Sequence, residues 1–149
     1  MGKRGEGWFV LQMVLFAVIA LAPRGVNAVF PAWLRLLGVM LIGAGGLFGT
    51  WAMITLGSNL TPYPKPIENG HLVTIGPYRL VRHPIYTGLI LATLGLTLAR
   101  ASAVGLALAM LLLLFFDLKS RREEQWLRER YPGYDSYQRR VRKLIPWLY

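Results

Sequence analysis

Cysteine is absent from this chain, histidine occurs only twice, and acidic side chains number 7 against 17 lysines and arginines. The absence of cysteine excludes disulfide bonds, thiolate metal sites and cysteine nucleophiles. The two histidines, His71 and His83, form no His-x-x-His pair, so we expect no bound metal ion. The shortage of acidic residues leaves a formal net charge of +10, which indicates an anionic partner such as a membrane surface or a nucleic acid.

Charge is nearly missing from four apolar runs, which cover residues 8–22, 33–57, 85–99 and 103–118. Hydrophobic residues make up 54% of the chain, and the mean hydropathy of +0.41 is too high for an ordinary soluble domain. A bilayer core is about 30 Å thick, so the second run is long enough to cross it, and interfacial residues extend the other three. We therefore expect an all-α polytopic membrane protein rather than a soluble helical bundle, with residues 1–149 forming one domain of about four transmembrane helices.

The basic residues are distributed unevenly among the segments that connect these runs. All but three of the 17 lysines and arginines precede the first run, lie between the second and third, or follow the fourth; the exceptions are Arg24, Arg35 and Arg100. In membrane proteins the excess of Lys and Arg marks the cytoplasmic side. We therefore expect a multi-pass protein with both termini and the loop 58–84 in the cytoplasm. Because the basic residues adjoin the apolar runs, attraction to anionic lipid explains them more simply than nucleic-acid binding does.

Proline and glycine divide the chain between and after the runs. The loop 58–84 holds several of both, so it cannot form one continuous helix. We expect the fourth helix to continue into the cytoplasmic tail, residues 119–149, until Pro132 and Gly133 stop it. A short amphipathic helix at 134–144 is expected to follow.

A glycine-rich segment at residues 43–49 lies inside the second run and suggests a nucleotide-binding loop at first sight. It follows no predicted strand, and its spacing does not match the dinucleotide fingerprint. Gly45 and Gly49 instead have the small-xxx-small spacing that lets two membrane helices approach closely. We therefore expect them to pack against another helix.

A polar cluster stands at the start of the third run, where polar groups are costly in a membrane helix unless they bind something. Pro84 fits the first turn of a helix without losing a hydrogen bond, and the free amides of that turn favour an anion such as a carboxylate. Arg82 adds a positive charge beside them. Tyr78 and Tyr86 offer ring faces for an adenine or a sulfonium cation. Glycines at the two ends of the cluster, Gly76 and Gly88, allow a ligand or a neighbouring helix close to the backbone.

The tail contributes Glu123 and Glu124, whose carboxylates suit an ammonium group or ribose hydroxyls. Simpler roles remain open for both groups of residues. Arg82 can bind a lipid phosphate, and His83 can cap or pack at the interface. Glu124 can form a surface pair with Arg128, four residues later on the same helix. An interfacial aromatic belt can account for the tail aromatics Tyr131, Tyr134, Tyr137 and Trp147.

A resemblance to a known family rests on two motifs. The first is G-P-Y-x-x-x-R-H-P-x-Y-x-G at residues 76–88, and the second joins E-E-x-x-L at 123–127 to Y-P-G-Y-x-x-Y at 131–137. Together they resemble the signature of the membrane methyltransferases related to isoprenylcysteine carboxyl methyltransferase and phosphatidylethanolamine N-methyltransferase. The resemblance covers residues 69–146, and the first two runs match only in being apolar.

The resemblance implies S-adenosylmethionine as methyl donor at the cytoplasmic membrane face and a lipophilic acceptor that enters from the bilayer. It implies that Arg82 orients the acceptor or the methionine carboxylate, and that Glu124 or His83 assists an amine acceptor in losing a proton. The acceptor classes left open are isoprenoid or prenylcysteine carboxylates, phospholipid amines and small thiols. The implied donor site comprises His71, Leu72, Val73, Gly76, Pro77, Tyr78, His83, Pro84, Tyr86, Gly88, Glu123 and Glu124.

Two other functions remain open. Sterol-type reductases that use NADPH carry a similar Arg-His-Pro-x-Tyr-x-Gly segment and a tyrosine-rich tail, but they are usually larger; the paired Glu123 and Glu124 favour the methyltransferase. A non-enzymatic membrane scaffold or lipid-binding protein would bind membrane lipids and no nucleotide-like ligand. With each of these functions we expect lipid partners, no nucleic acid and no metal.

Overall fold

The computed structural model describes residues 5–24, 30–146 and 148–149. Within this part of the chain the regular structure is helical, so the predicted all-α class is confirmed. The predictions above that concern Lys3, Arg4 and Trp147 lie outside the described residues.

The described residues form five α-helices, in the order expected from the four apolar runs and the tail. Two of them, α2 and α4, are long and apolar enough to cross a membrane, and α1 and α3 are shorter apolar helices. The helix ends lie close to the predicted ones, and the long fourth helix that we expected is present. The bounds are α1 (Glu6–Leu21), α2 (Ala32–Leu56), α3 (Pro84–Ala99), α4 (Ala103–Arg130) and α5 (Tyr134–Arg140).

Local signals in the sequence explain where α3 and α4 begin and end. Pro84 occupies the first turn of α3, where its missing N–H costs nothing. The hydroxyl of Ser102 accepts a hydrogen bond of 2.9 Å from the Gly105 amide and caps the start of α4. After Arg130 the chain leaves the helix immediately before Pro132, as predicted.

Close packing of α2 on α3 depends on glycine. A Cβ atom added at Gly45 would lie 2.5 Å from the Gly88 carbonyl oxygen, and one added at Gly95 would lie 2.5 Å from the Gly38 carbonyl oxygen. Two backbones this close leave no room for a side chain. The prediction that Gly45 packs against another helix is therefore confirmed.

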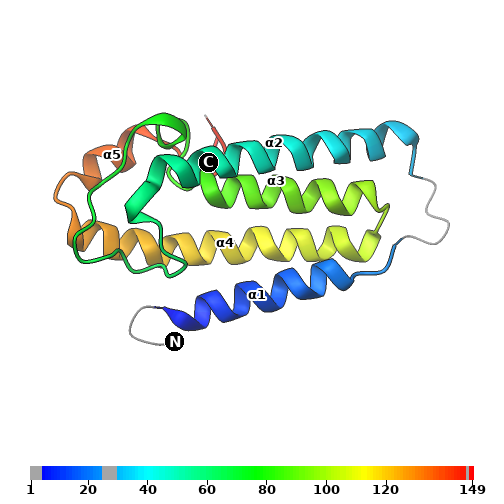
Figure 1. Cartoon of the computed structure of the whole chain (residues 1–149), viewed down its shortest axis with the longest axis horizontal. Helices are drawn as coiled ribbons and strands as arrows, with labels where there is room; N and C mark the ends of the chain where they lie inside the picture. Colours follow the sequence, from blue (N-terminus) through cyan, green and yellow to red (C-terminus); the bar gives the residue numbers. More distant parts are fainter. Residues whose placement is uncertain (1–4, 25–29, 147) are drawn as a thin grey trace.

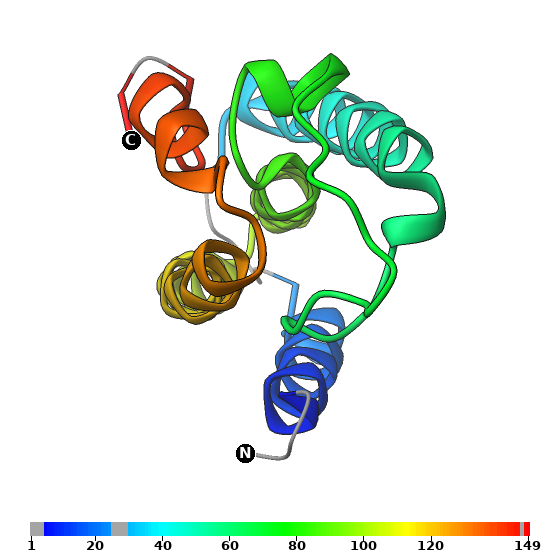
Figure 2. The ribbon, with the colours of Figure 1, turned by 90° about the vertical axis from the view of Figure 1, so that its left-hand side faces the viewer.

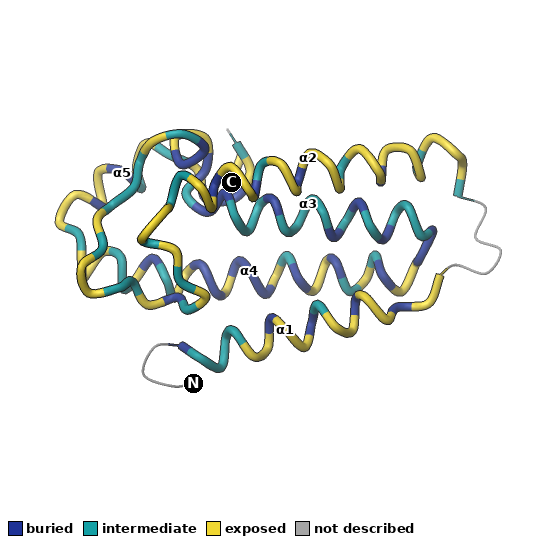
Figure 3. The backbone as a smooth tube through the Cα atoms, viewed as in Figure 1, coloured by how far each residue is buried: buried dark blue, intermediate teal, exposed yellow. Residues whose placement is uncertain are grey.

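The helices alternate in direction, so the N-terminal end, the loop after α2 and the tail after α4 gather at one end of the molecule (Figure 1). Seen from that end, α3 lies between α2 and α4, and α1 lies beside α4 and below α3, away from α2 (Figure 2). Apolar side chains of α1 and α4 form the core, namely Leu15, Ile19, Leu112, Phe115 and Phe116. Much of the α2 surface is exposed (Figure 3), and it includes apolar side chains such as Leu47, which is 77% exposed.

The loop between α2 and α3 contains short 3-10 helices at Gly57–Asn59 and Gly76–Arg79, in agreement with the prediction that it is no continuous helix. The tail packs onto the end of this loop. The Arg82 amide donates to the Arg142 carbonyl at 2.8 Å, and the His83 amide donates to the Lys143 carbonyl at 3.1 Å. Because the chain turns extended at Val141 and then makes these bonds, the predicted amphipathic helix at 134–144 ends at Arg140 and is shorter than we expected.

Candidate functional site

A cavity of about 560 Å³ lies where the loop and the tail meet the ends of the long helices. Helices α1, α2, α3 and α4 and the loop all contribute to its walls. Among the predicted site residues, those that line it are His71, Leu72, Val73, Tyr78, Arg82, His83, Pro84, Tyr86, Gly88 and Glu123. Gly76, Pro77 and Glu124 do not line it.

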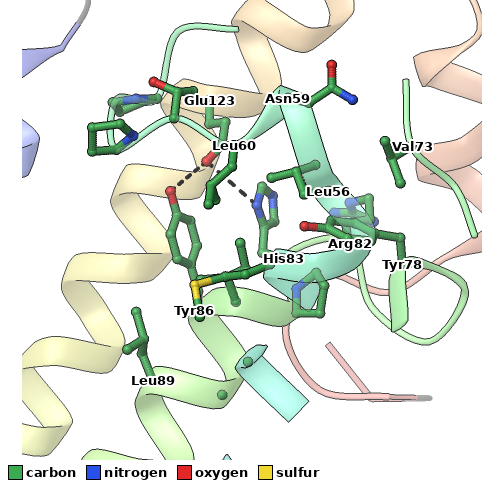
Figure 4. A pocket seen from close by; sticks show the side chains of 18 of the residues that line it. Leu56, Asn59, Leu60, Val73, Tyr78, Arg82, His83, Tyr86, Leu89 and Glu123 are labelled. Carbon is green, nitrogen blue, oxygen red and sulfur yellow. Dashed lines mark hydrogen bonds and ion pairs between the residues drawn. The ribbon is translucent and has the colours of Figure 1, made fainter. Parts of the chain in front are cut away.

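His83 and Tyr86 at the start of α3 and Glu123 of α4 form a polar group (Figure 4). The Tyr86 hydroxyl donates to Glu123 Oε2 at 2.7 Å, and His83 Nδ1 lies 3.7 Å from the same oxygen. The His83 and Tyr86 rings are stacked with centroids 5.4 Å apart. These contacts use one oxygen of a carboxylate that is 24% exposed. Glu123 Oε1 makes no hydrogen bond within the described chain, so it is available to a ligand.

Glu124 lies behind this group and is only 4% exposed. Its Oε1 accepts from Arg82 Nε at 2.8 Å and lies 3.1 Å from His83 Nε2, and its Oε2 accepts from Gln138 at 3.0 Å. Burial by itself would raise the pKa of Glu124, but the hydrogen bonds and charges of His83 and Arg82 outweigh burial and hold this pKa well below its usual range. Glu124 therefore joins the loop, α4 and the tail as an ionised carboxylate.

The surface-pair interpretation of Glu124 is wrong. Arg128 contacts only the Glu124 backbone, through a hydrogen bond of 3.3 Å to the carbonyl oxygen. The Glu124 carboxylate instead faces inward, toward the network just described. The (i, i+4) spacing failed as a guide because long-range partners from the loop and tail bind this carboxylate.

Arg82 turns its guanidinium into the protein and not outward to lipid. Besides its bond to Glu124, the side chain donates from Nη1 to the Gln138 and Val141 carbonyl oxygens. The side chain is 10% exposed and lines the cavity. Nη2 has no hydrogen-bond partner among the residues that the structure describes, so Arg82 is held by two nitrogens and keeps a third for a ligand.

Two tail tyrosines are buried and do not form a surface belt as the alternative interpretation required: Tyr134 is 1% exposed and Tyr137 is 4% exposed. The Tyr137 hydroxyl donates to the Tyr78 carbonyl at 2.7 Å. The Tyr134 hydroxyl is buried without a hydrogen-bond partner in the described chain, and Tyr134 lines the cavity. Burial, followed by the charge of Glu124, raises the pKa of Tyr134 well above 10.0, so this hydroxyl is a neutral donor without an acceptor.

The loop provides the opposite wall of the cavity. Asn59 Oδ1 accepts from the His71 amide at 3.0 Å, and the Asn59 amide nitrogen lies 3.3 Å from His71 Nε2. Leu72 and Val73 follow with apolar side chains. These contacts hold His71 against Asn59, just after the end of α2.

Two glycines of the first motif are needed for a turn of the backbone and for close helix packing. Gly76 has φ +57, in the left-handed region that favours glycine, and it begins the turn that carries Pro77 and Tyr78. Gly88 lines the cavity, but a Cβ there would lie 2.6 Å from the Gly45 carbonyl oxygen. Of the two uses left open for Gly88, the structure therefore provides the close approach of a neighbouring helix.

Four polar residues of the site region were missed in the sequence analysis. Gln12 and Lys119 line the cavity, as does Asn59, and Gln138 binds Glu124. Gln12 carried a usable signal, because it is the single polar side chain of the run 8–22. Asn59 and Gln138 lie in polar segments and carried none.

Comparisons with known proteins show which family and which proteins this chain is similar to. Residues 33–133 match the sequence profile of a family described as phospholipid methyltransferase. The chain is 34% identical over 116 residues to the cobalt-zinc-cadmium resistance protein CzcN of Cupriavidus metallidurans, covering 77% of this chain and 49% of that protein. It is 28% identical over 120 residues to protein-S-isoprenylcysteine O-methyltransferase B of Arabidopsis thaliana, covering 78% of this chain and 61% of that protein.

A third relative is the nickel-cobalt-cadmium resistance protein NccN of Alcaligenes xylosoxydans xylosoxydans, which is 25% identical over 140 residues, or 93% of this chain and 62% of that protein. The chain thus spans between about half and three fifths of the length of these relatives. Two of the three are named for metal resistance. Within residues 5–24, 30–146 and 148–149, no group of three His, Cys, Asp or Glu side chains is arranged to hold a metal ion.

Proposed function

Because this chain belongs to the phospholipid methyltransferase family, we propose that it transfers a methyl group from S-adenosylmethionine to a lipophilic acceptor. The observation that carries the proposal is the cavity in which the polar group His83, Tyr86 and Glu123 meets a largely apolar lining. Two relatives named as isoprenylcysteine O-methyltransferases support the reaction class. The profile match favours this reaction over reduction by NADPH and over a scaffold without a ligand.

Our proposal places α1 to α4 across a membrane, with both termini and the loop 58–84 on the cytoplasmic side. The shared end of the molecule at which the N-terminal end, loop and tail gather supports this arrangement (Figure 1). The excess of Lys and Arg in the same segments supports the cytoplasmic orientation. The exposed apolar surface of α2 would then face lipid, and a lipophilic acceptor would reach the cavity from the bilayer.

The residues of the cavity fit the proposed donor. S-adenosylmethionine carries an ammonium, a carboxylate, ribose hydroxyls and an adenine, and supplies a methyl group activated by its sulfonium. The free oxygen of Glu123 suits the ammonium or a ribose hydroxyl. The unpartnered hydroxyl of Tyr134 suits an acceptor atom of the donor. Leu72, Val73 and Tyr78 offer apolar and ring surfaces for the adenine.

Positioning by the chain itself accounts for catalysis in this proposal. Methyl transfer is a direct displacement, so a protein that aligns the two reactants lowers the barrier without forming a covalent intermediate. Arg82 would orient the carboxylate of an acceptor or of the donor through Nη2, since Glu124 and the tail carbonyls hold the rest of its guanidinium. Glu124 is accordingly a positioning residue. A carboxylate acceptor needs no base, whereas an amine acceptor would lose its proton to His83.

The proposal is tested by methyl transfer in lipid vesicles. Purified full-length protein is mixed with radiolabelled S-adenosylmethionine and, in separate reactions, with a prenylcysteine carboxylate, a phosphatidylethanolamine and a small thiol. Label in one extracted acceptor, absent when the protein is omitted, is the expected result. Specific binding of NADPH without binding of S-adenosylmethionine would overturn the proposal in favour of the reductase, and binding of neither would favour the scaffold.

A further inference from the structure

The ammonium group of Lys119 is buried at the membrane side of the site. Lys119 lies on α4 one turn before Glu123 and is 2% exposed. Its Nζ donates to Gln12 Oε1 of α1 at 2.6 Å and lies 5.2 Å from the centroid of the Tyr86 ring. Both Lys119 and Gln12 line the cavity.

This ammonium lacks the close ion pair that a second buried lysine possesses, and the charge of Glu123 acts on it only from beyond ion-pair distance. Lys143 Nζ lies 2.6 Å from the Asp117 carboxylate and 3.1 Å from the Asp117 carbonyl oxygen. Lys119 makes one hydrogen bond, to a neutral amide, and no carboxylate of the described chain lies within 4.0 Å of its nitrogen. An ammonium has three N–H donors, and a buried charge without a partner is costly. Besides the contact with the Tyr86 ring, two N–H donors without a hydrogen-bond partner in the described chain are therefore left for a group inside the cavity.

We propose that Lys119 and Gln12 form a subsite for the anionic group, a carboxylate or a phosphate, of the amphiphilic acceptor. The inference rests on the proposed function, because it concerns the acceptor of that reaction. Lys119 lies closer to the apolar run of α4 than Glu123 does, and Phe16 and Leu89 line the same cavity. An amphiphile with its chain against these apolar side chains can present its head group to Lys119. Gln12 belongs to α1, which precedes the matched residues 33–133, so the subsite adds a selectivity that the family profile does not include.

Binding of a fluorescent amphiphile tests the subsite without any methyl transfer. The full chain is placed in lipid nanodiscs, and binding of cis-parinaric acid or its methyl ester is followed by energy transfer from tryptophan. Wild-type protein is expected to bind the acid at least tenfold more tightly than the neutral ester. Lys119→Met should reduce this preference to less than twofold. Arg130→Met, which removes an exposed cation from the same helix, should retain it.

Thermal unfolding separates a binding role of Lys119 from a structural one. Lys119→Met is expected to melt at the same temperature as wild type or higher, because it removes a buried charge that has no carboxylate within 4.0 Å in the described chain. The double variant Gln12→Leu with Lys119→Met removes both polar groups, and its melting temperature should likewise equal or exceed that of wild type. A lower melting temperature in both variants would make Lys119 a structural residue and would overturn the proposal, as would an acid preference that survives Lys119→Met.

Calorimetric titration with S-adenosylmethionine distinguishes the acceptor from the donor as the source of the anion. Donor affinity is expected to change less than twofold in Lys119→Met. A tenfold loss of donor affinity with an unchanged acid preference would assign the subsite to the donor carboxylate and overturn the acceptor assignment. If wild-type protein binds no S-adenosylmethionine yet prefers the acid through Lys119, the proposed function fails while the anionic subsite is supported.

Discussion

Glu124 accepts a hydrogen bond of 2.8 Å from Arg82, although 42 positions separate the two residues in the chain. The same Glu124 oxygen lies 3.1 Å from His83, and its second oxygen accepts from Gln138 of α5. One buried carboxylate thus joins the end of the loop, the long helix and the tail. This explains how a motif before α3 and a motif after the fourth apolar run can serve a single cavity.

Replacement of Arg82 by lysine tests whether its planar guanidinium positions a reactant. Lysine keeps the charge but cannot bind Glu124 and the tail carbonyls while presenting a further nitrogen to a ligand. We expect Arg82→Lys to lower methyl transfer at least tenfold, or about 1.4 kcal/mol in the activation free energy, in protein that remains folded. Arg79→Lys, at an exposed position, is the matched control and should keep full activity. Activity near wild type in Arg82→Lys would assign Arg82 to lipid or structure.

Glu124 is expected to govern the acid stability of the protein. Its folded-state pKa is lowered from 4.5, so its ionised form stabilises the folded state fully above pH 4.5, and this stabilisation is lost as the pH falls through the folded-state pKa. Glu124→Gln should cost about 3 kcal/mol of unfolding free energy near neutral pH, because Arg82 loses a buried partner. The melting temperature of Glu124→Gln should also change less than that of wild type between pH 6 and pH 3.

Thermal unfolding across this range is the measurement for Glu124. The exposed Glu129 on the same helix supplies the control, since Glu129→Gln should reproduce the wild-type pH dependence. Parallel curves for wild type and Glu124→Gln would show that the Glu124 carboxylate is not the group responsible.

The Tyr134 hydroxyl is expected to add nothing to the stability of the free protein but to strengthen donor binding. Without a ligand it is buried and has no hydrogen-bond partner among the residues that the structure describes, so Tyr134→Phe should leave the melting temperature unchanged or raise it. If the hydroxyl binds the donor, the same change should weaken S-adenosylmethionine binding about fivefold, a loss of the order of 1 kcal/mol. Calorimetric titration measures the affinity for S-adenosylmethionine, with Tyr63→Phe, at a tyrosine of the loop, as the variant for comparison. Equal donor affinity in Tyr134→Phe and wild type would exclude this contact.

Close packing of α2 on α3 predicts a position-dependent effect of adding one methyl group. Gly45→Ala places a Cβ 2.5 Å from the Gly88 carbonyl oxygen and should destabilise the protein by about 1–3 kcal/mol. Gly43→Ala adds the same methyl group two residues earlier, where no atom of another described segment lies within 4 Å of the added Cβ, and should be neutral or slightly stabilising. Denaturation of the two variants in the same detergent measures the difference. Equal stability would contradict the packing described for Gly45.

The helices could be predicted from the sequence because their signals are local. Pro84 sets the start of α3. The length of α4 is set by the apolar run that ends at Leu118 and by the break at Pro132. The charge distribution placed the two motifs on the same side of the membrane, and the family resemblance implied that they form one site. Pairs such as Glu124 with Gln138 and Lys119 with Gln12 depend on how the helices are rotated against one another, and no local pattern records that rotation.

The central claim is that the cavity beside Glu123 binds S-adenosylmethionine. Calorimetric titration of the purified full-length protein with S-adenosylmethionine tests it most directly, with Glu123→Gln as the site variant and Glu129→Gln as the exposed control on the same helix. We expect saturable binding to wild type and to Glu129→Gln, and at least tenfold weaker binding, about 1.4 kcal/mol, to Glu123→Gln. No binding to folded wild-type protein, or equal affinity in all three proteins, would contradict the claim.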